Sequence, residues 1–144
     1  MRKLKLISLT LVFIFLSCQE YEVKKNNLYR LKTTKKCPKC DLSEMKLKRT
    51  KLIKADLFGA DLSNTNLSES DLTGANLKHV NFSQTDLRGA NLKNANLDSK
   101  LLESAILCHT TMPNGKIVYS NCKNANLSQV DLRGTDLRGA DLRW

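Results

Sequence analysis

Large apolar residues recur at every fifth position through most of this chain. Between residues 42 and 142 this register holds 21 positions, of which seventeen are Leu and the others are Phe82, Met112, Ile117 and Cys122. A period of five fits neither the 3.6-residue period of an α-helix nor the two-residue alternation of a flat strand. The pattern predicts a chain that turns a corner every five residues and coils, because coiling buries all of these side chains.

The positions around each central residue are also regular. The residue two before it is small in nineteen of the 21 cases, and the residue one before it is Asp or Asn in fifteen. Five of the six glycines lie two positions after it. Small residues can point inward beside Leu, whereas Asp, Asn and Gly tolerate turn conformations. The many Asp side chains are therefore interpreted as corner residues and not as catalytic carboxylates.

Pentads such as Ala55-Asp56-Leu57 and Ala90-Asn91-Leu92 resemble those of the pentapeptide-repeat family, and the resemblance covers about residues 40–144. It implies an all-β fold, a right-handed quadrilateral β-helix with four pentads in each coil and about five coils. At the ~4.8 Å spacing of stacked strands, this rod is roughly 25 Å long. Its interior is a narrow column of side chains with no buried cleft, so we expect no enzymatic activity, no cofactor and no metal.

Residues 1–17 have the pattern of a signal peptide. A basic Met-Arg-Lys-Leu-Lys start precedes an apolar run from Leu6 to Ser17, which is shorter than the ~20 residues of a membrane span. Cys18 follows Phe15-Leu16-Ser17 and resembles the cysteine of a bacterial lipobox, with Phe15 where Leu is usual. The resemblance implies lipidation of Cys18 and a mature chain anchored to a membrane of the bacterial cell envelope, on its periplasmic or surface side. An ordinary secretory signal or an uncleaved anchor is the alternative.

The net charge of +10 lies mostly near the N-terminus. Residues 1–17 contribute +3, residues 18–40 contribute +5 and residues 41–144 contribute +2. Residues 18–39 are therefore interpreted as a basic, solvated tether beside a membrane that can carry anionic lipid.

The outward positions of the repeat form no face of a single sign. The best-known activity of the family that the chain resembles is DNA mimicry by an acidic rod that binds DNA gyrase. That activity needs a negative surface and a cytoplasmic location, so it is disfavoured here, and no nucleic-acid partner is expected. A set of four arginines is interpreted as a solvated face: Arg88, Arg133, Arg138 and Arg143.

Four cysteines follow Cys18, at Cys37, Cys40, Cys108 and Cys122. In an exported protein an even set predicts disulfides. Local pairing, Cys37–Cys40 and Cys108–Cys122, is favoured, although four cysteines allow three pairings. Each bond would pin a coil end or the base of a loop.

Two other interpretations of the cysteines stay open. Cys37 and Cys40 form a C-x-x-C pattern that resembles a thiol-redox motif, but without the β-α-β setting that lowers a thiol pKa. Together with Cys108, His109 and Cys122 they could form a zinc site. However, Cys40 and Cys108 are about three coils apart, or ~14–15 Å along the rod, and ligands of one metal lie much closer together.

The segment 108–122 keeps the repeat frame although its sequence differs. Leu107 and Cys122 are three pentads apart, with Met112 and Ile117 in the apolar slots. Its C-x-T-x-M-P-N-G pattern resembles an interruption found in a subset of the family. We predict three coil sides, bulged at residues 113–115 and closed by Cys108–Cys122.

The stretch 99–107 allows two conformations. Leu101 and Ile106 replace the usual Asp or Asn. As coil, these side chains would point outward and need a cover; as helix, they would share one face. We favour a covered coil side.

Taken together, the residues predict a signal peptide (1–17), a tether (18–39) and a β-helix (40–144). The predicted function is that of a non-catalytic, exported, lipid-anchored scaffold that binds a protein partner the sequence does not identify. Association of copies through coil ends is compatible with this fold. The alternative is an envelope thiol-redox or metal-binding protein that uses Cys37 and Cys40, or Cys108, His109 and Cys122.

Overall fold

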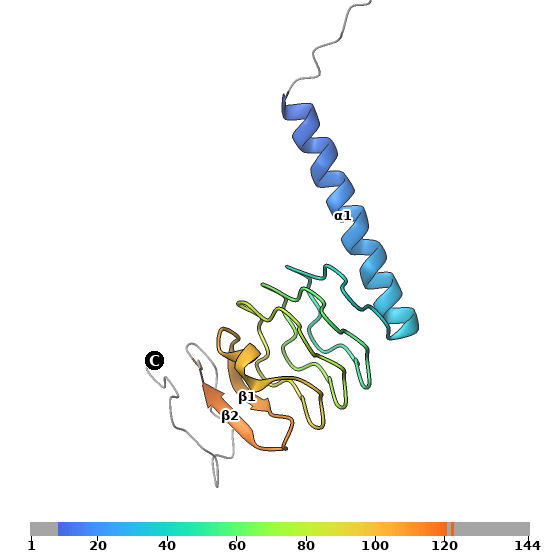
Figure 1. Ribbon diagram of the computed structural model, residues 1–144. Coiled ribbons are helices and arrows are strands. Elements are labelled where there is room, and N and C mark those ends of the chain that lie inside the picture. Colours follow the sequence, from blue (N-terminus) through green and yellow to red (C-terminus); the bar gives the residue numbers. More distant parts are fainter. Residues whose placement is uncertain (1–8, 121, 123–144) are drawn as a thin grey trace, which may run out of the picture.

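The structure, a computed structural model, describes residues 9–120 and 122. Its elements are α-helix α1 (Leu9–Thr34), 3₁₀-helix η1 (Ser99–Leu102) and strands β1 (Leu107–Thr111) and β2 (Ile117–Ser120). Between α1 and η1 the chain winds into stacked coils with short straight sides, and α1 projects from one end of the stack (Figure 1).

The coils repeat every twenty residues. Parallel bridges join residues twenty apart, from Lys36–Asp56 to Asn91–Thr111. At one side, Leu42 N donates to Asp61 O at 2.9 Å, and Asp61 N donates to Cys40 O at 2.9 Å. Twenty residues are four pentads, so each coil has four sides. The predicted right-handed quadrilateral β-helix is confirmed, whereas the end of the predicted fifth coil lies outside the described residues.

The central and small positions of the pentads form the core. From residue 42 to residue 107 the central residues are buried, except Leu97, which is partly exposed. Small residues from the preceding slots fill the space between them: Ala55, Ala60, Thr65, Ser70, Ala75, Val80, Thr85, Ala90, Ala95 and Ala105. Full burial of each Leu contributes roughly 1.5–3 kcal/mol, so the stabilisation is spread along the whole stack.

Each corner from residue 39 to residue 94 is a β-turn with a left-handed residue. Ala55 N donates to Leu52 O at 3.0 Å, and Lys54, the third residue of this turn, has a φ of 54°. A positive φ at the third position defines a type II turn, which favours Gly or Asn there. Gly89, with a φ of 68°, occupies the equivalent position of a later turn. This geometry explains why the glycines lie two residues after a central Leu.

The Asp and Asn residues stabilise the corners by accepting backbone hydrogen bonds. Asp61 Oδ1 accepts from Ser63 N at 2.9 Å, and Asn66 Oδ1 accepts from Ser68 N at 3.0 Å. This Asx arrangement mimics a backbone turn. It confirms that the periodic Asp residues act as corner residues at these positions.

The β-helix begins one pentad earlier than the predicted boundary at residue 40. Lys36 is bridged to Asp56, and Cys37, five residues before Leu42, is fully buried. The register of five therefore extends back to Cys37. The sequence pattern did not indicate this, because Cys occupies the central position where Leu is usual.

Residues 18–34 of the tether predicted at 18–39 are helical, and the helix packs on the first coil from Lys24 onward. Leu31 of α1 is only 1% exposed and belongs to the core of the stack. Asn27 Nδ2 donates to Asp41 O at 3.0 Å. The helix thus covers a coil end that would otherwise present an unpaired strand edge. In the part of the chain described, no helix is both long and apolar enough to cross a membrane.

The stack changes at residues 99–102, where η1 replaces a coil side. The bridge from Asn81 to Leu101 is missing from the otherwise regular ladder. Asp98 caps η1, since its carboxylate accepts from Lys100 N at 3.0 Å. The favoured covered coil is therefore wrong, and the short helix is the observed alternative. Leu102 and Ala105 nevertheless stay buried in the repeat frame.

Of the three coil sides predicted for segment 108–122, the first is present, the hairpin replaces the second, and the third lies mostly outside the described residues. Thr111 still bridges Asn91, but the chain then reverses, and β2 pairs antiparallel with β1. Met112 N donates to Lys116 O at 2.8 Å across the reversal. Gly115, with a φ of 82°, lies exposed in this turn and not in an inward slot. The Pro-Asn-Gly turn and the apolar residues of β2 favour a hairpin over two further corners.

Candidate functional site

Cys18 lies on α1 and is the free cysteine among the described residues, with an exposed side chain. About 24 Å of helix separates it from Thr34, at 1.5 Å per residue. Its thiol is therefore open to an enzyme that modifies it.

An ion-pair network holds the middle of α1 to the first coil. Lys24 Nζ lies 3.1 Å from Glu20 Oε1 and 3.8 Å from Asp41 Oδ2. The hydrogen bond with Glu20 and the charge of Asp41 raise the pKa of Lys24, although burial opposes this. The lysine therefore stays charged between the helix and the coil.

The first cysteine pair lies at the coil end beneath α1. The Sγ atoms of Cys37 and Cys40 are 1.97 Å apart, and their Cα atoms are 5.4 Å apart. Both residues belong to the same buried cluster as Leu31. A bond here would tie the start of the β-helix together directly below the helix that covers it.

The second pair joins Cys108 of β1 to Cys122, two residues after the end of β2. The Sγ atoms of Cys108 and Cys122 are 2.20 Å apart, and both residues are buried. The structure thus brings together the two pairs that the sequence favours. The oxidation state of these pairs stays a prediction.

The two histidines contact aromatic rings. His79 lies edge-on to Phe58 with ring centroids 5.2 Å apart, and His109 lies 5.6 Å from Tyr119. Among residues 9–120 and 122, no group of three His, Cys, Asp or Glu side chains could hold a metal ion. His109 therefore lies beside the second cysteine pair as an exposed aromatic contact.

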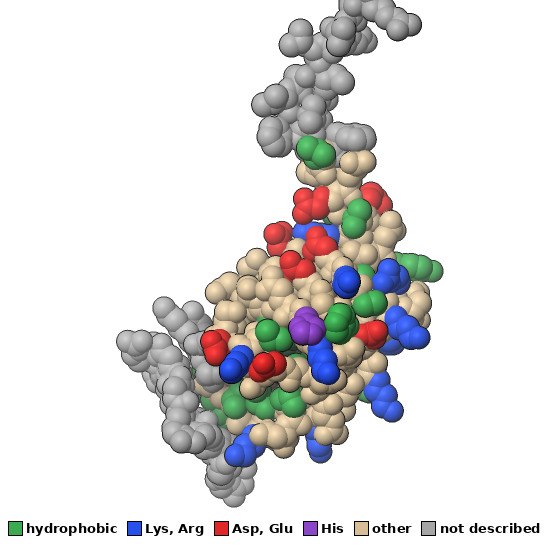
Figure 2. Space-filling view, in the orientation of Figure 1, with side chains coloured by type: hydrophobic (Ala, Val, Ile, Leu, Met, Phe, Trp, Pro, Cys, Tyr) green, Lys and Arg blue, Asp and Glu red, His purple; other side chains and the backbone are tan. Residues whose placement is uncertain are grey.

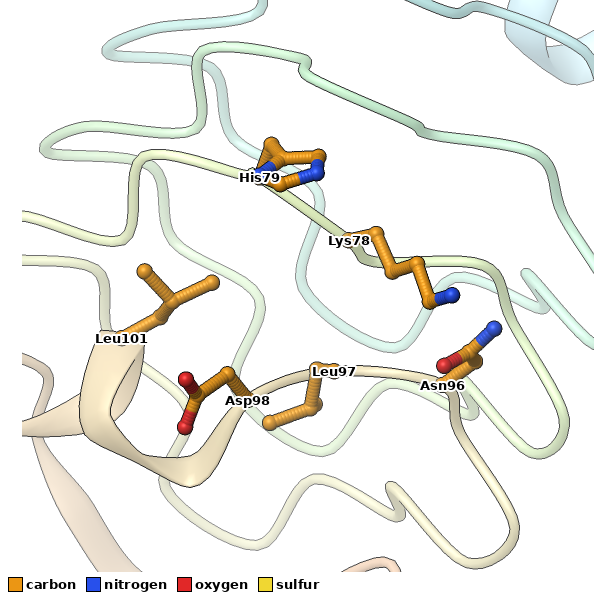
Figure 3. Close-up of a pocket in the computed structure, with 6 residues that line it drawn as sticks. All are labelled: Lys78, His79, Asn96, Leu97, Asp98 and Leu101. Atoms are coloured by element: carbon orange, nitrogen blue, oxygen red, sulfur yellow. The ribbon is translucent and has the colours of Figure 1, made fainter.

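One shallow hollow of about 390 Å³ lies where η1 interrupts the stack. Figure 3 shows Lys78 and His79 on one coil, residues 96–98 on the next, and Leu101 on η1. The sequence analysis did not identify this hollow, although Leu101 in an Asp or Asn position signals the break that forms it. Its lining holds no nucleophile beside a base, so it fits a binding contact better than catalysis.

Two groups of charged residues form ion pairs on the coil surface. The first joins neighbouring coils. Lys48 Nζ lies 2.9 Å from Glu69 Oε1, and Arg49 Nε donates to the other oxygen of the same carboxylate. The hydrogen bonds from Arg49 and Lys48 lower the pKa of Glu69.

Arg88 forms a two-pronged contact with Asp86, at 2.9 Å from Nε to Oδ1 and 2.7 Å from Nη2 to Oδ2. Burial would raise the pKa of Asp86, but these hydrogen bonds lower it overall. Arg88 is therefore paired locally. The other members of the four-arginine set, at positions 133, 138 and 143, lie outside the described residues.

Comparison with known protein families gives one match. The family described as "Pentapeptide repeats" matches with eight copies, over residues 36–64, 65–99 and 116–144. The unmatched residues 100–115 contain β1 and the turn that breaks the repeat. Among curated proteins, none matches the chain.

Similar solved structures include three cyanobacterial pentapeptide repeat proteins. Rfr23 from Cyanothece 51142 is 25% identical with a TM-score of 0.48, over 67% of this chain and 75% of that one. HetL from Nostoc sp. strain PCC 7120, involved in heterocyst differentiation regulation, is 28% identical with a TM-score of 0.31, over 57% and 51%. Another protein from Nostoc PCC 7120, alr5209, is 22% identical with a TM-score of 0.37, over 73% and 89%.

The matched pentads extend over more than half of the sequence, and the described coils show the geometry that such pentads produce. This chain belongs to the pentapeptide repeat family.

Proposed function

We propose that this protein is an exported lipoprotein whose β-helix serves as a rigid, non-catalytic binding surface at the cell envelope. Pentapeptide repeat proteins are generally non-catalytic structural or binding scaffolds. The observation that carries the proposal is the contrast among the cysteines. Cys18, which follows the apolar leader, is free and exposed, whereas the other four lie in two buried pairs.

Export is supported by the arrangement of these pairs. Their sulfur atoms lie at bonding distance in the buried parts of the stack. Disulfides persist in oxidising compartments such as the bacterial periplasm and are rare in the cytosol. A leader that directs export would deliver the chain to a compartment where both bonds can form.

A role in binding is supported by the filled interior. Leu, Phe and small side chains occupy the column inside the described coils, where they leave no enclosed space for a substrate. The features that a partner could recognise lie on the outside of the coils: the hollow beside η1 and the charged coil surfaces. A protein partner is the class of ligand that such a rigid convex surface fits best.

Burial of the cysteines argues against the thiol-redox alternative. Cys37 is 0% exposed and Cys40 is 4% exposed, whereas exchange needs a sulfur that a partner thiolate can attack. Cys108 and Cys122 are equally enclosed, at 3% and 4%. A structural role is therefore favoured for both pairs.

Intact-mass analysis of the protein purified from membranes of its own cells tests the proposal. We expect a mature chain that begins at Cys18 and carries the mass of acyl groups, and a Cys18→Ser variant that lacks them. A mature chain that begins elsewhere, or at Cys18 without acyl mass, would contradict lipidation. Crosslinking and pull-down from the same membranes would then identify the protein partner.

A further inference from the structure

The net charge of the chain is concentrated in one short segment. Residues 24–54 contain twelve basic and two acidic residues, a net charge of +10 that equals the charge of the whole protein. This segment comprises the end of α1 and the first coil of the stack. All other residues together have a net charge of zero. The charge is therefore distributed very unevenly along the chain.

Some of these basic residues are already neutralised. Lys48 and Arg49 share Glu69, Lys25 pairs with Glu22 at 3.6 Å, and Lys24 is held between Glu20 and Asp41. Seven others are exposed and form no ion pair with any described residue: Arg30, Lys32, Lys35, Lys36, Lys39, Lys51 and Lys54. We call these seven residues the basic end. Lys46 is likewise unpaired, but it lies on another side of the coil.

Two contacts within the basic end join the end of α1 to two sides of the first coil. Arg30 Nε donates to Lys36 O at 3.2 Å, which ties the last turns of α1 to the first coil side. Lys35 Nζ donates to Lys51 O at 2.7 Å, which ties that side to the last side of the same coil. Figure 2 shows several Lys and Arg side chains on the side of the coil stack where α1 ends in Figure 1.

Apolar side chains lie exposed beside these charges. Tyr29, next to Arg30, is 72% exposed, and Ile53, between Leu52 and Lys54, is 44% exposed. Tyr favours the boundary between water and lipid, because its ring is apolar and its hydroxyl is polar. A basic surface with one exposed aromatic and one exposed aliphatic side chain beside it is suited to a membrane interface.

We propose that the basic end docks on a membrane surface that contains anionic phospholipid. Each Lys or Arg near such a surface adds to the attraction, so the basic end would supplement the proposed lipid anchor. Cys18 lies in α1, sixteen residues before Thr34 at the C-terminal end of the helix, where the basic end begins, so both reach the same membrane when α1 lies along it. The inference rests on the proposed envelope location for its biological setting, but the affinity for anionic lipid belongs to the folded chain itself.

Vesicle co-sedimentation of the full-length Cys18→Ser chain tests this inference without acylation. Phosphatidylcholine vesicles with and without phosphatidylglycerol are compared, at low and at high salt. We expect tighter binding to the anionic vesicles, with the difference lost at high salt because ions screen exposed charges. Equal binding to both vesicles would overturn the proposal, whatever the outcome for Cys18.

A matched pair of charge variants locates the surface. The test variant combines Lys35→Gln, Lys36→Gln, Lys51→Gln and Lys54→Gln; the control combines Lys78→Gln, Lys93→Gln, Lys100→Gln and Lys116→Gln. Both remove four positive charges from exposed positions. The test variant should bind anionic vesicles at least about ten-fold more weakly, and the control should bind nearly as the parent does. Equal losses would assign the binding to net charge alone and overturn the proposed surface, as would tighter binding to a double-stranded DNA fragment than to the vesicles.

Discussion

The hydroxyl of Thr110 donates a 2.7 Å hydrogen bond to the carbonyl oxygen of Leu87, twenty-three residues earlier. Thr65 and Thr85 make the same contact with Leu42 and Leu62, at 2.7 and 2.8 Å. Thr110 lies in β1, inside the segment whose sequence departs from the repeat. The modified segment therefore begins as an ordinary coil side, with Thr110 in the usual inward position, and departs from the repeat only at the hairpin turn after Thr111.

The hydrogen bonds of these buried hydroxyls are expected to contribute to the free energy of unfolding. Thr110→Val keeps the side-chain shape and removes the donor, while Leu87 O still accepts from Ala90 N. We expect a loss of about 1 kcal/mol in the free energy of unfolding, measured by urea titration followed by circular dichroism. Thr85→Val should cost about as much, since its environment is equivalent. A loss for Thr85→Val alone would mean that β1 is not held in the slot.

The packing of α1 is tested by Leu31→Ala. Leu31 is buried in the core of the stack, so the truncation should cost about 2–5 kcal/mol. Limited proteolysis should then cut α1 faster, because the helix loses its main apolar contact. Tyr29→Ala, at an exposed position of the same helix, serves as the control and should change stability by less than about 0.5 kcal/mol. Equal effects of the two substitutions would refute the docked helix.

The reversal between β1 and β2 predicts where the chain tolerates insertion. One Gly inserted between Asn114 and Gly115 lengthens a surface turn and should cost less than about 1 kcal/mol. One Gly inserted between Leu77 and Lys78 shifts every later residue out of the twenty-residue stack and should cost several times more. Thermal unfolding of both variants decides. A large cost for the first insertion would favour the three coil sides expected from the sequence.

Reduction of the cysteine pairs should loosen the two ends unequally. Cys108–Cys122 has a sequence separation of 14 and Cys37–Cys40 one of 3. Since the effect of a crosslink grows with the loop it closes, loss of the first bond should cost about 3 kcal/mol and loss of the second about 2 kcal/mol. Cys108→Ala/Cys122→Ala and Cys37→Ala/Cys40→Ala variants measure these costs. Free-thiol counting on the protein from its own compartment provides the check, and thiols at any of these four positions would contradict the disulfides.

The contact between Arg88 and Asp86 predicts lower stability in acid. The pKa of Asp86 is lower in the folded chain than in the unfolded one, where it is about 3.9. Its contribution is therefore complete above about pH 4 and is lost as the pH falls through the folded pKa. The free energy of unfolding should decrease with falling pH in this range, and Arg88→Gln should make the decrease smaller. An unchanged pH dependence in that variant would exclude the pair as its source.

Much of the fold could be predicted because the repeat depends on residues that are close together in the sequence. A central Leu, a small residue two before it and an Asp or Asn between them recur in each turn of the chain. The contacts that these residues make, such as Asp61 Oδ1 with Ser63 N, are local or exactly one coil away. The same regularity placed Cys40 and Cys122 in the core and favoured their local partners.

The sequence by itself determined the filled interior and a corner every five residues, because both depend on a pattern that recurs along the chain, and the coil of twenty residues followed from the resemblance of its pentads to the pentapeptide-repeat family. Only the tertiary structure decided what happens where the pattern fails. Leu101 was compatible with a coil side or a helix, and the residues after Thr111 with further corners or a hairpin; in each case the choice depends on which surfaces pack together. The docking of Leu31 on the first coil was equally hidden, because a helix of mixed polarity shows which residues it buries only when the end of the stack it covers is known.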